Sequence, residues 1–214
     1  MGNRAMILVP TLRGNSNPTR EILENGHNPT PNVNMFNPTN FIIWNIRGGN
    51  NEDFRRNFRD LIDTHRPCMV TLLETRMQSH APLLHEFGFS ELIEVPADGQ
   101  AGGMVLLWDH TKVTVQNAVR RNHGIHATIE VHPTNLKWLF SSLYASTNTV
   151  DRDIMCNNLK NIADSHKDSW LVGGDINDVF SADDKIGGRP LNRRRDFKLW
   201  DNLNNYKLQD LGYK

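Results

Sequence analysis

Apolar and polar positions follow two different rhythms along this chain from residue 41 onward. Continuous apolar runs are typical of buried strands, and segments with an apolar residue at every second position are typical of half-buried antiparallel strands. The continuous runs cover residues 41–44, 68–73, 103–108 and 169–174, and the alternating segments cover residues 112–119 and 124–131. Two more strands are predicted over residues 90–95 and 136–144.

Amphipathic helices interrupt these strands towards both ends of the region. The first is predicted between Asn51, a candidate cap, and Pro67, because Phe54 and Phe58 stand at helical spacing. Further helices are predicted over residues 82–87 and over residues 193–204. Between them, Thr149 is a candidate cap for a helix that carries Ile154, Met155, Leu159 and Ile162 on one face. Antiparallel strands with helices around them predict an α/β fold in which two sheets pack face to face.

The first 40 residues differ in composition from the rest. They hold 5 of the 10 prolines and 9 asparagines, and the triplet Asn-Pro-Thr occurs three times. Each proline removes a backbone donor and forces the preceding residue out of the helical region. We therefore expect a disordered Asn/Pro-rich segment over residues 1–40, in preference to a peptide ligand, and one folded domain over residues 41–214.

Composition narrows the class of protein. The 24 Lys and Arg residues balance the 24 Asp and Glu residues, and 38% of the residues are hydrophobic, which predicts a sizeable core and excludes global disorder. No apolar run is long enough to span a membrane, and no obligate protein partner is evident. Two cysteines, Cys68 and Cys156, cannot build a disulfide scaffold and suit a reducing, intracellular compartment.

Charge is uneven towards the C-terminus. Residues 151–184 carry eight acids and three bases, whereas residues 185–200 carry six bases and one acid. The basic residues predicted to contact nucleic acid are Arg193, Arg194, Arg195 and Lys198. They either follow a DNA backbone or form the solvated start of the last helix, although arginines at a helix N-terminus oppose its dipole.

Polar residues stand where predicted strands end. Asn45 follows the first apolar run, Glu74 the second, and Asp175 and Asn177 the last, while Tyr144 closes the strand over residues 136–144. Each of these residues alone is also an ordinary turn residue. Together they point to a site, since strand ends gathered along one rim commonly carry function. Carboxylates are oxygen ligands that hard divalent cations prefer, and amides and phenols donate hydrogen bonds to phosphate oxygens.

Four short motifs give the chain a family resemblance. They are Trp44-Asn45-Ile46-Arg47-Gly48, Leu72-Leu73-Glu74-Thr75-Arg76, Ser142-Leu143-Tyr144-Ala145 and Gly174-Asp175-Ile176-Asn177. In this order they resemble the endonuclease/exonuclease/phosphatase (DNase I-like) superfamily. The segments 102–108, 170–179, 184–188 and 210–213 look most like the apurinic-type endonuclease domain of plant LINE-type (non-LTR) retrotransposons. The resemblance covers about residues 41–214.

The resemblance implies a four-layered α/β sandwich and a hydrolase that nicks DNA with Mg²⁺ (or Mn²⁺). Glu74 would ligate the ion with Asn45 close to it, Asp175 would orient or activate the attacking water, and Asn177 and Tyr144 would hold the scissile phosphate. A metal and fixed donors suit this chemistry, because they neutralise the phosphate oxygens and position phosphorus for in-line attack. DNA as substrate would make a nuclear location the expectation.

The family's closing Ser-Asp-His triplet does not occur in this sequence. We therefore expect a C-terminally truncated domain that lacks its last strands, with weak or no activity, since general acid–base catalysis typically contributes about 10²–10⁴-fold in rate. Two alternatives stay open. One is a non-catalytic retrotransposon remnant that at most binds nucleic acid, and the other is a phosphoesterase acting on RNA or inositol phosphates.

Overall fold

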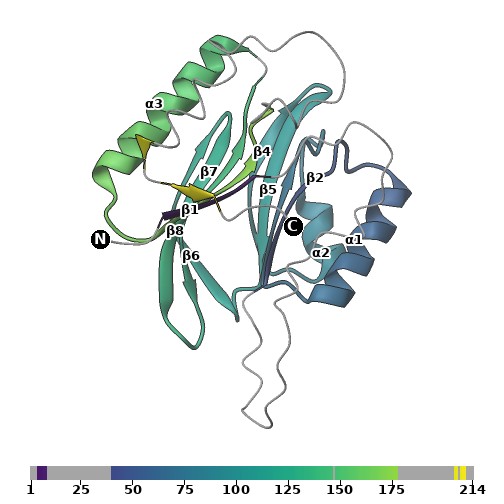
Figure 1. Cartoon of the computed structure of the whole chain (residues 1–214). Coiled ribbons are helices and arrows are strands. Elements are labelled where there is room, and N and C mark those ends of the chain that lie inside the picture. The colour runs from purple at the N-terminus through teal and green to yellow at the C-terminus, as the bar shows by residue number, and fades with distance from the viewer. Residues whose placement is uncertain (1–3, 9–39, 147, 178–204, 207, 211–214) are drawn as a thin grey trace.

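Two β-sheets and three helices make up the part of the chain that the structure, a computed structural model, describes (residues 4–8, 40–146, 148–177, 205–206 and 208–210; Figure 1). The strands are β1 (Arg4–Leu8), β2 (Phe41–Asn45), β3 (Met69–Leu73), β4 (Glu91–Asp98), β5 (Ala101–Trp108), β6 (Val113–Arg121), β7 (Gly124–Val131), β8 (Leu136–Tyr144), β9 (Trp170–Asp175) and β10 (Gln209–Asp210). The helices are α1 (Glu52–His65), α2 (Ala81–Phe87) and α3 (Thr149–Ser165).

The larger sheet has six strands in the order β10-β1-β9-β8-β7-β6, and the smaller has four in the order β2-β3-β5-β4. Each sheet contains a parallel pair of strands whose ends matter below: β2 runs parallel to β3 in the smaller sheet, and β8 runs parallel to β9 in the larger one. The pairs β3·β5, β4·β5, β6·β7 and β7·β8 are antiparallel. Parallel neighbours end at the same edge of a sheet, which brings residues far apart in sequence to one rim.

The apolar side chains divide into three layers of core. Between the sheets, Leu73 and Leu106 pack with Ile129 and Phe140 of the larger sheet. Outside the smaller sheet, Phe58 of α1 belongs to a cluster that also includes residues of α2, β3 and β5, and outside the larger sheet α3 packs in the same way. Helix, sheet, sheet and helix therefore form four layers (Figure 1), and the α/β sandwich expected from the sequence is confirmed.

Helix α1 shows how local sequence sets the fold. The side chain of Asn51 accepts a 2.7 Å hydrogen bond from the backbone N–H of Phe54, and Glu52 lies in the first turn, where the helix dipole favours an acid. The rings of Phe54 and Phe58 stack with centroids 5.3 Å apart and face the smaller sheet. The predicted cap and apolar stripe are both confirmed.

Three details of the structure differ from the sequence prediction. Residues Arg4–Leu8 form β1, which lies between β9 and β10 and is parallel to both, inside the segment predicted to be disordered. The cap of α3 is Asn148, not Thr149: its side chain accepts from the N–H of Val150 at 2.8 Å. Ile154, predicted on the apolar face of α3, is 52% exposed, because the buried stripe runs through Met155 and Leu159.

The rest of the first 39 residues, the helix predicted over residues 193–204 and the basic residues Arg193, Arg194, Arg195 and Lys198 lie outside the described residues. Among the helices that the structure does describe, none has the length and apolar character needed to cross a membrane.

Candidate active site

The carboxyl ends of two parallel strand pairs meet at one rim of the sandwich. In the smaller sheet Asn45 lies beside Leu73, the residue before Glu74. In the larger sheet Tyr144 lies beside Asp175. The side-chain amide of Asn45 donates a 2.7 Å hydrogen bond to Oδ2 of Asp175, and this contact links the rims of the two sheets.

Asp175 is the most enclosed polar group of this rim. It is 1% exposed, and its other oxygen, Oδ1, accepts from the backbone N–H of Asn177 at 2.8 Å. The amide oxygen of Asn45 in turn accepts from the backbone N–H of Arg47 at 3.2 Å. A buried carboxylate needs such donors to offset its lost hydration, so the site holds Asp175 in one orientation.

Asn177 is held in place by the loops around it. Its backbone has a left-handed φ of 48°, and its side-chain amide donates to the carbonyl of Ala145 at 2.7 Å. Its own carbonyl accepts a 2.7 Å hydrogen bond from the guanidinium of Arg152 on α3, which also donates to the carbonyl of Ser146 at 2.8 Å. Arg152 therefore ties the loop after β8 to the loop after β9.

Glu74 stands directly after β3 with a left-handed φ of 52°. Its Oε1 accepts a 2.7 Å hydrogen bond from the guanidinium of Arg76, which also has a left-handed φ, of 55°. Thr75, between them, donates its N–H to the carbonyl of Gly103 and accepts from the N–H of Gly49. Backbone strain of this kind persists where the surroundings fix it, and it is frequent at functional sites.

The phenol of Tyr144 interacts with Glu74, Asp175 and Asn177 of the rim. Burial raises the pKa of Tyr144, and the carboxylates of Glu74 and, more weakly, Asp175 raise it further. A hydrogen bond with Asn177 and the charge of Arg76 act in the opposite direction. The phenol therefore stays protonated at neutral pH and is able to donate a hydrogen bond.

Oxygen ligands at this rim fit a hard divalent cation. Within the described residues, no three His, Cys, Asp or Glu side chains gather closely enough to hold an ion by themselves. Mg²⁺ commonly uses one or two carboxylates and completes its shell with water and substrate phosphate. Glu74 supplies a carboxylate, and the Asn45 amide oxygen keeps a second lone pair beside the one used by Arg47.

All five residues predicted for catalysis or metal binding, Asn45, Glu74, Tyr144, Asp175 and Asn177, are thus brought to one rim. Sequence reasoning did not single out Arg76 or Arg152. Arg76 is visible two positions after Glu74, where an ion pair between loop neighbours could be expected. Arg152 carries no such signal, because its partners follow β8 and β9 and only the tertiary fold brings them to α3.

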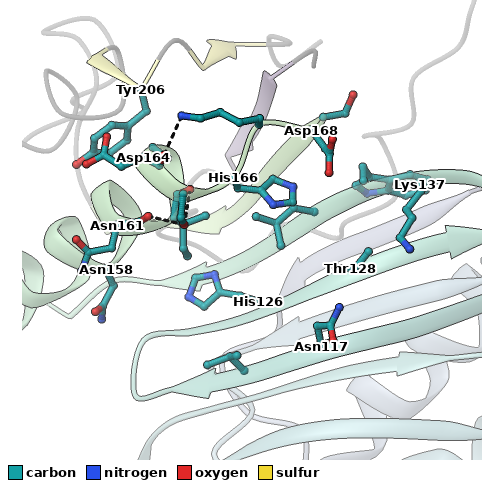
Figure 2. A pocket seen from close by; sticks show the side chains of 18 of the residues that line it. Asn117, His126, Thr128, Lys137, Asn158, Asn161, Asp164, His166, Asp168 and Tyr206 are labelled. Atoms are coloured by element: carbon teal, nitrogen blue, oxygen red, sulfur yellow. Dashed lines mark hydrogen bonds between the residues drawn. The ribbon is translucent and has the colours of Figure 1, made fainter. Parts of the chain in front are cut away.

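A large cavity of the described structure lies elsewhere, on the outer face of the larger sheet beside α3 (Figure 2). Its volume is about 1750 Å³, and its walls include His126 and Thr128 of the sheet and Asn158 and Asn161 of the helix. None of the five rim residues lines it. We assign the candidate site to the rim, because the convergent carboxylates, amides and phenol lie there.

The sequence pattern that defines the endonuclease/exonuclease/phosphatase family matches residues 42–210. The chain belongs to this family, and the resemblance to it that the sequence predicted is confirmed. No curated protein sequence was found to match the chain.

Solved structures share the sandwich at low sequence identity. The AP endonuclease LMAP from Leishmania major has a TM-score of 0.56 at 12% identity, over 78% of this chain and 64% of that one. A mannosyl-6-phosphatase from Bacteroides thetaiotaomicron has a TM-score of 0.50 at 12% identity, over 66% and 67%. The human nocturnin catalytic domain with bound sulfate has a TM-score of 0.45 at 18% identity, and the chain covers 63% of itself and 64% of that domain. The first two of these similarities show the fold.

Proposed function

We propose that this protein is a divalent-metal-dependent phosphodiesterase of the DNA-nicking type, related to the apurinic-type endonucleases of plant LINE-type (non-LTR) retrotransposons. The observation that carries the proposal is the contact of Asn45 with Asp175, which joins the two sheets beside Glu74 and Tyr144. Membership of the family makes phosphoester hydrolysis the coarse expectation. The retrotransposon-like motifs around residues 102–108 and 170–179 favour DNA over other phosphoesters.

Glu74 and the amide oxygen of Asn45 are proposed to hold Mg²⁺ or Mn²⁺. When bound, the ion would neutralise charge on the phosphate and on the leaving oxygen. Asp175 accepts hydrogen bonds on both oxygens in this structure, and we propose that it orients the attacking water and takes up its proton. Tyr144 and Asn177 donate to the non-bridging oxygens and so position phosphorus for in-line attack.

The sequence contains no Ser-Asp-His triplet, so the proposed activity of this chain is weak. That absence favours one alternative, in which the protein binds nucleic acid without cutting it. A second alternative is hydrolysis of RNA or inositol phosphates, and the similarity of the sandwich to that of a mannosyl-6-phosphatase adds sugar phosphates to the compounds worth testing. We also propose an intracellular protein, nuclear if DNA is its substrate.

The test is nicking of supercoiled plasmid by the purified protein with Mg²⁺ or Mn²⁺, beside Glu74→Gln and the control Glu91→Gln. Glu91 is an exposed glutamate on β4. Slow, metal-dependent nicking that is lost in Glu74→Gln and kept in Glu91→Gln is the expected result. Folded protein that does not nick, yet retains labelled DNA on a filter, would replace the proposal by the non-catalytic alternative. Phosphate release from sugar or inositol phosphates without nicking would replace it by the phosphoesterase.

A further inference from the structure

A chain of buried polar side chains leads from β4 to the residue next to Glu74. His80, at the start of α2, is fully buried, and its two ring nitrogens have different partners. Nδ1 lies 2.7 Å from Oε2 of Glu94, and Nε2 lies 2.7 Å from Oγ1 of Thr75. The same Glu94 oxygen accepts the backbone N–H of His80 at 2.7 Å.

The chemistry of the partners fixes the direction of these hydrogen bonds. Burial lowers the pKa of His80, against the effect of Glu94, so the ring is neutral and carries one proton. An ionised carboxylate only accepts, so Nδ1–H donates to Glu94 and Nε2 is left as an acceptor. The hydroxyl of Thr75 therefore donates to His80, and its lone pairs remain available to the N–H of Met77, 3.4 Å away.

Thr75 is the point at which three loops are joined. Its N–H donates to the carbonyl of Gly103 at 3.0 Å, and its carbonyl accepts from the N–H of Gly49 at 2.7 Å. Gly49 belongs to the loop that follows Asn45, and Gly103 to the hairpin of β4 and β5. With the hydroxyl bound to His80, every polar group of this fully buried residue has a partner.

Packing alone does not explain why these three buried positions carry polar side chains. A valine has almost the shape of threonine and would fill the same space without a hydroxyl, and an apolar side chain at position 80 would then need no acid on β4. Buried polar groups weaken a core unless all are satisfied, and satisfied networks fix one conformation. What is fixed here is the short stretch in which Glu74 and Arg76 both adopt left-handed backbone conformations.

We propose that Glu94, His80 and Thr75 form a positioning unit, which holds the carboxylate of Glu74 at the rim in the orientation that receives a divalent cation. The inference rests on the proposed function, in which Glu74 is a metal ligand. None of the three side chains touches the reacting atoms: His80 and Glu94 act through Thr75, and Thr75 acts through the backbone of Glu74.

The first test compares Thr75→Val with Thr75→Ser in direct binding of Mn²⁺, followed by electron paramagnetic resonance of the free ion. Serine keeps the hydroxyl, and valine keeps the shape without it. Loss of a group that orients a metal ligand typically weakens affinity about 10–100-fold. We expect a loss of that size in Thr75→Val and an affinity close to that of the unaltered protein in Thr75→Ser.

A second pair of variants tests the two contacts of His80 separately. The amide of Gln in His80→Gln reaches the position of Nε2 and keeps a contact to Thr75, whereas the amide of Asn in His80→Asn reaches the position of Nδ1 and keeps only the contact to Glu94. Gln is therefore expected to retain more of the Mn²⁺ affinity than Asn. This pair decides the question if Thr75→Val does not fold.

Ile129→Val is the matched control, because Ile129 is buried between the sheets and is not part of the rim. It lowers stability without changing Mn²⁺ affinity. Thr75→Val, or His80→Asn compared with His80→Gln, could also lower stability and leave Mn²⁺ affinity unchanged. In that case Glu94, His80 and Thr75 have only a structural role and the inference is wrong, while the proposed function stands. If the unaltered protein binds no Mn²⁺, or Glu74→Gln binds it equally well, the proposed role of Glu74 and this inference both fail.

Discussion

The amide of Asn45 and the carboxylate of Asp175 are 130 positions apart in sequence and 2.7 Å apart in space. Asn45 ends a strand of the smaller sheet and Asp175 ends a strand of the larger one. Their hydrogen bond therefore fixes the spacing of the two rims at the point where a phosphate would enter.

Replacing Asn45 tests this relationship. Asn45→Ala leaves the buried Asp175 with one donor fewer, and a hydrogen bond to a charged group contributes roughly 1.5–3 kcal/mol. We expect the free energy of unfolding in urea to fall by about that amount, and any nicking to slow by at least about tenfold. Asn50→Ala, an exposed position in the same loop, should change neither quantity. Equal stability of Asn45→Ala and the unaltered protein would show that the contact does not join the rims.

His126 makes the stability of the fold sensitive to acid. Its ring is 8% exposed, with Nδ1 at 2.8 Å from Oγ of Ser141. Burial, and to a smaller extent the charge of Arg121, lowers its pKa to about 4. In the unfolded chain a histidine titrates near pH 6.5, so below that value the unfolded state binds the proton first. The contribution of neutral His126 to the free energy of unfolding is therefore complete above about pH 6.5. It is lost as the pH falls towards 4, and the loss amounts to at most about 3 kcal/mol.

Urea unfolding across this pH window measures the effect, and His126→Gln removes the titrating group. The variant should have a flatter pH dependence, although His80, whose pKa is also lowered by burial, contributes a loss in the same direction. An unchanged slope in His126→Gln would assign the acid sensitivity to other groups.

The cap of α1 offers a measurement of fold stability away from the candidate ligands. Asn51→Ala removes the acceptor of the Phe54 N–H and also the donor to the carbonyl of Gly48. Loss of such a cap typically costs about 1 kcal/mol. Thermal or urea unfolding should show that loss for Asn51→Ala but not for Asn50→Ala. Equal losses in the two variants would show that the helix does not depend on this cap.

Two glycines of the β4–β5 hairpin should respond differently to a methyl group. Both have left-handed φ, 58° at Gly99 and 81° at Gly103, so Ala at either position costs about 1–2 kcal/mol in backbone strain. At Gly103 an added Cβ would also stand 2.5 Å from Oγ1 of Thr75, whereas at Gly99 it would meet nothing within 4 Å. We expect Gly103→Ala to be clearly the less stable in urea. Equal stabilities would mean that the loop around Thr75 yields easily.

Local sequence was sufficient to predict a strand or helix wherever the element itself has a clear pattern of apolar and polar residues. The continuous apolar runs predicted β3 and β9 because both are largely buried, and the cap and phenylalanine spacing predicted α1. The residues Asn45 and Asp175 were found because each follows such a run in a recognisable motif. In these elements the residues that are apolar in the sequence are also those that are buried in the structure, so the pattern alone predicts the element.

Sequence reasoning failed where the partner of a residue is distant. Residues 4–8 form a short apolar stretch followed by many Asn and Pro residues, and they become a strand by pairing with β9 and β10. His80 likewise has no local signal, because Thr75 and Glu94 give it its role only after β4 has folded beside the loop. Such long-range pairings cannot be read from composition or periodicity.

The position of β1 has a consequence for how the chain acquires its fold. Arg4 pairs with Trp170, a separation of 166 residues, and β10 on its other side begins at Gln209. A ribosome adds about 5–20 residues per second, so β1 waits on the order of ten seconds or more for β9 to be made. Contacts of such high sequence separation slow folding. The larger sheet therefore cannot be completed before residues 170–175 and 209–210 are made, and until β9 exists β8 has an open edge at which a chaperone could act.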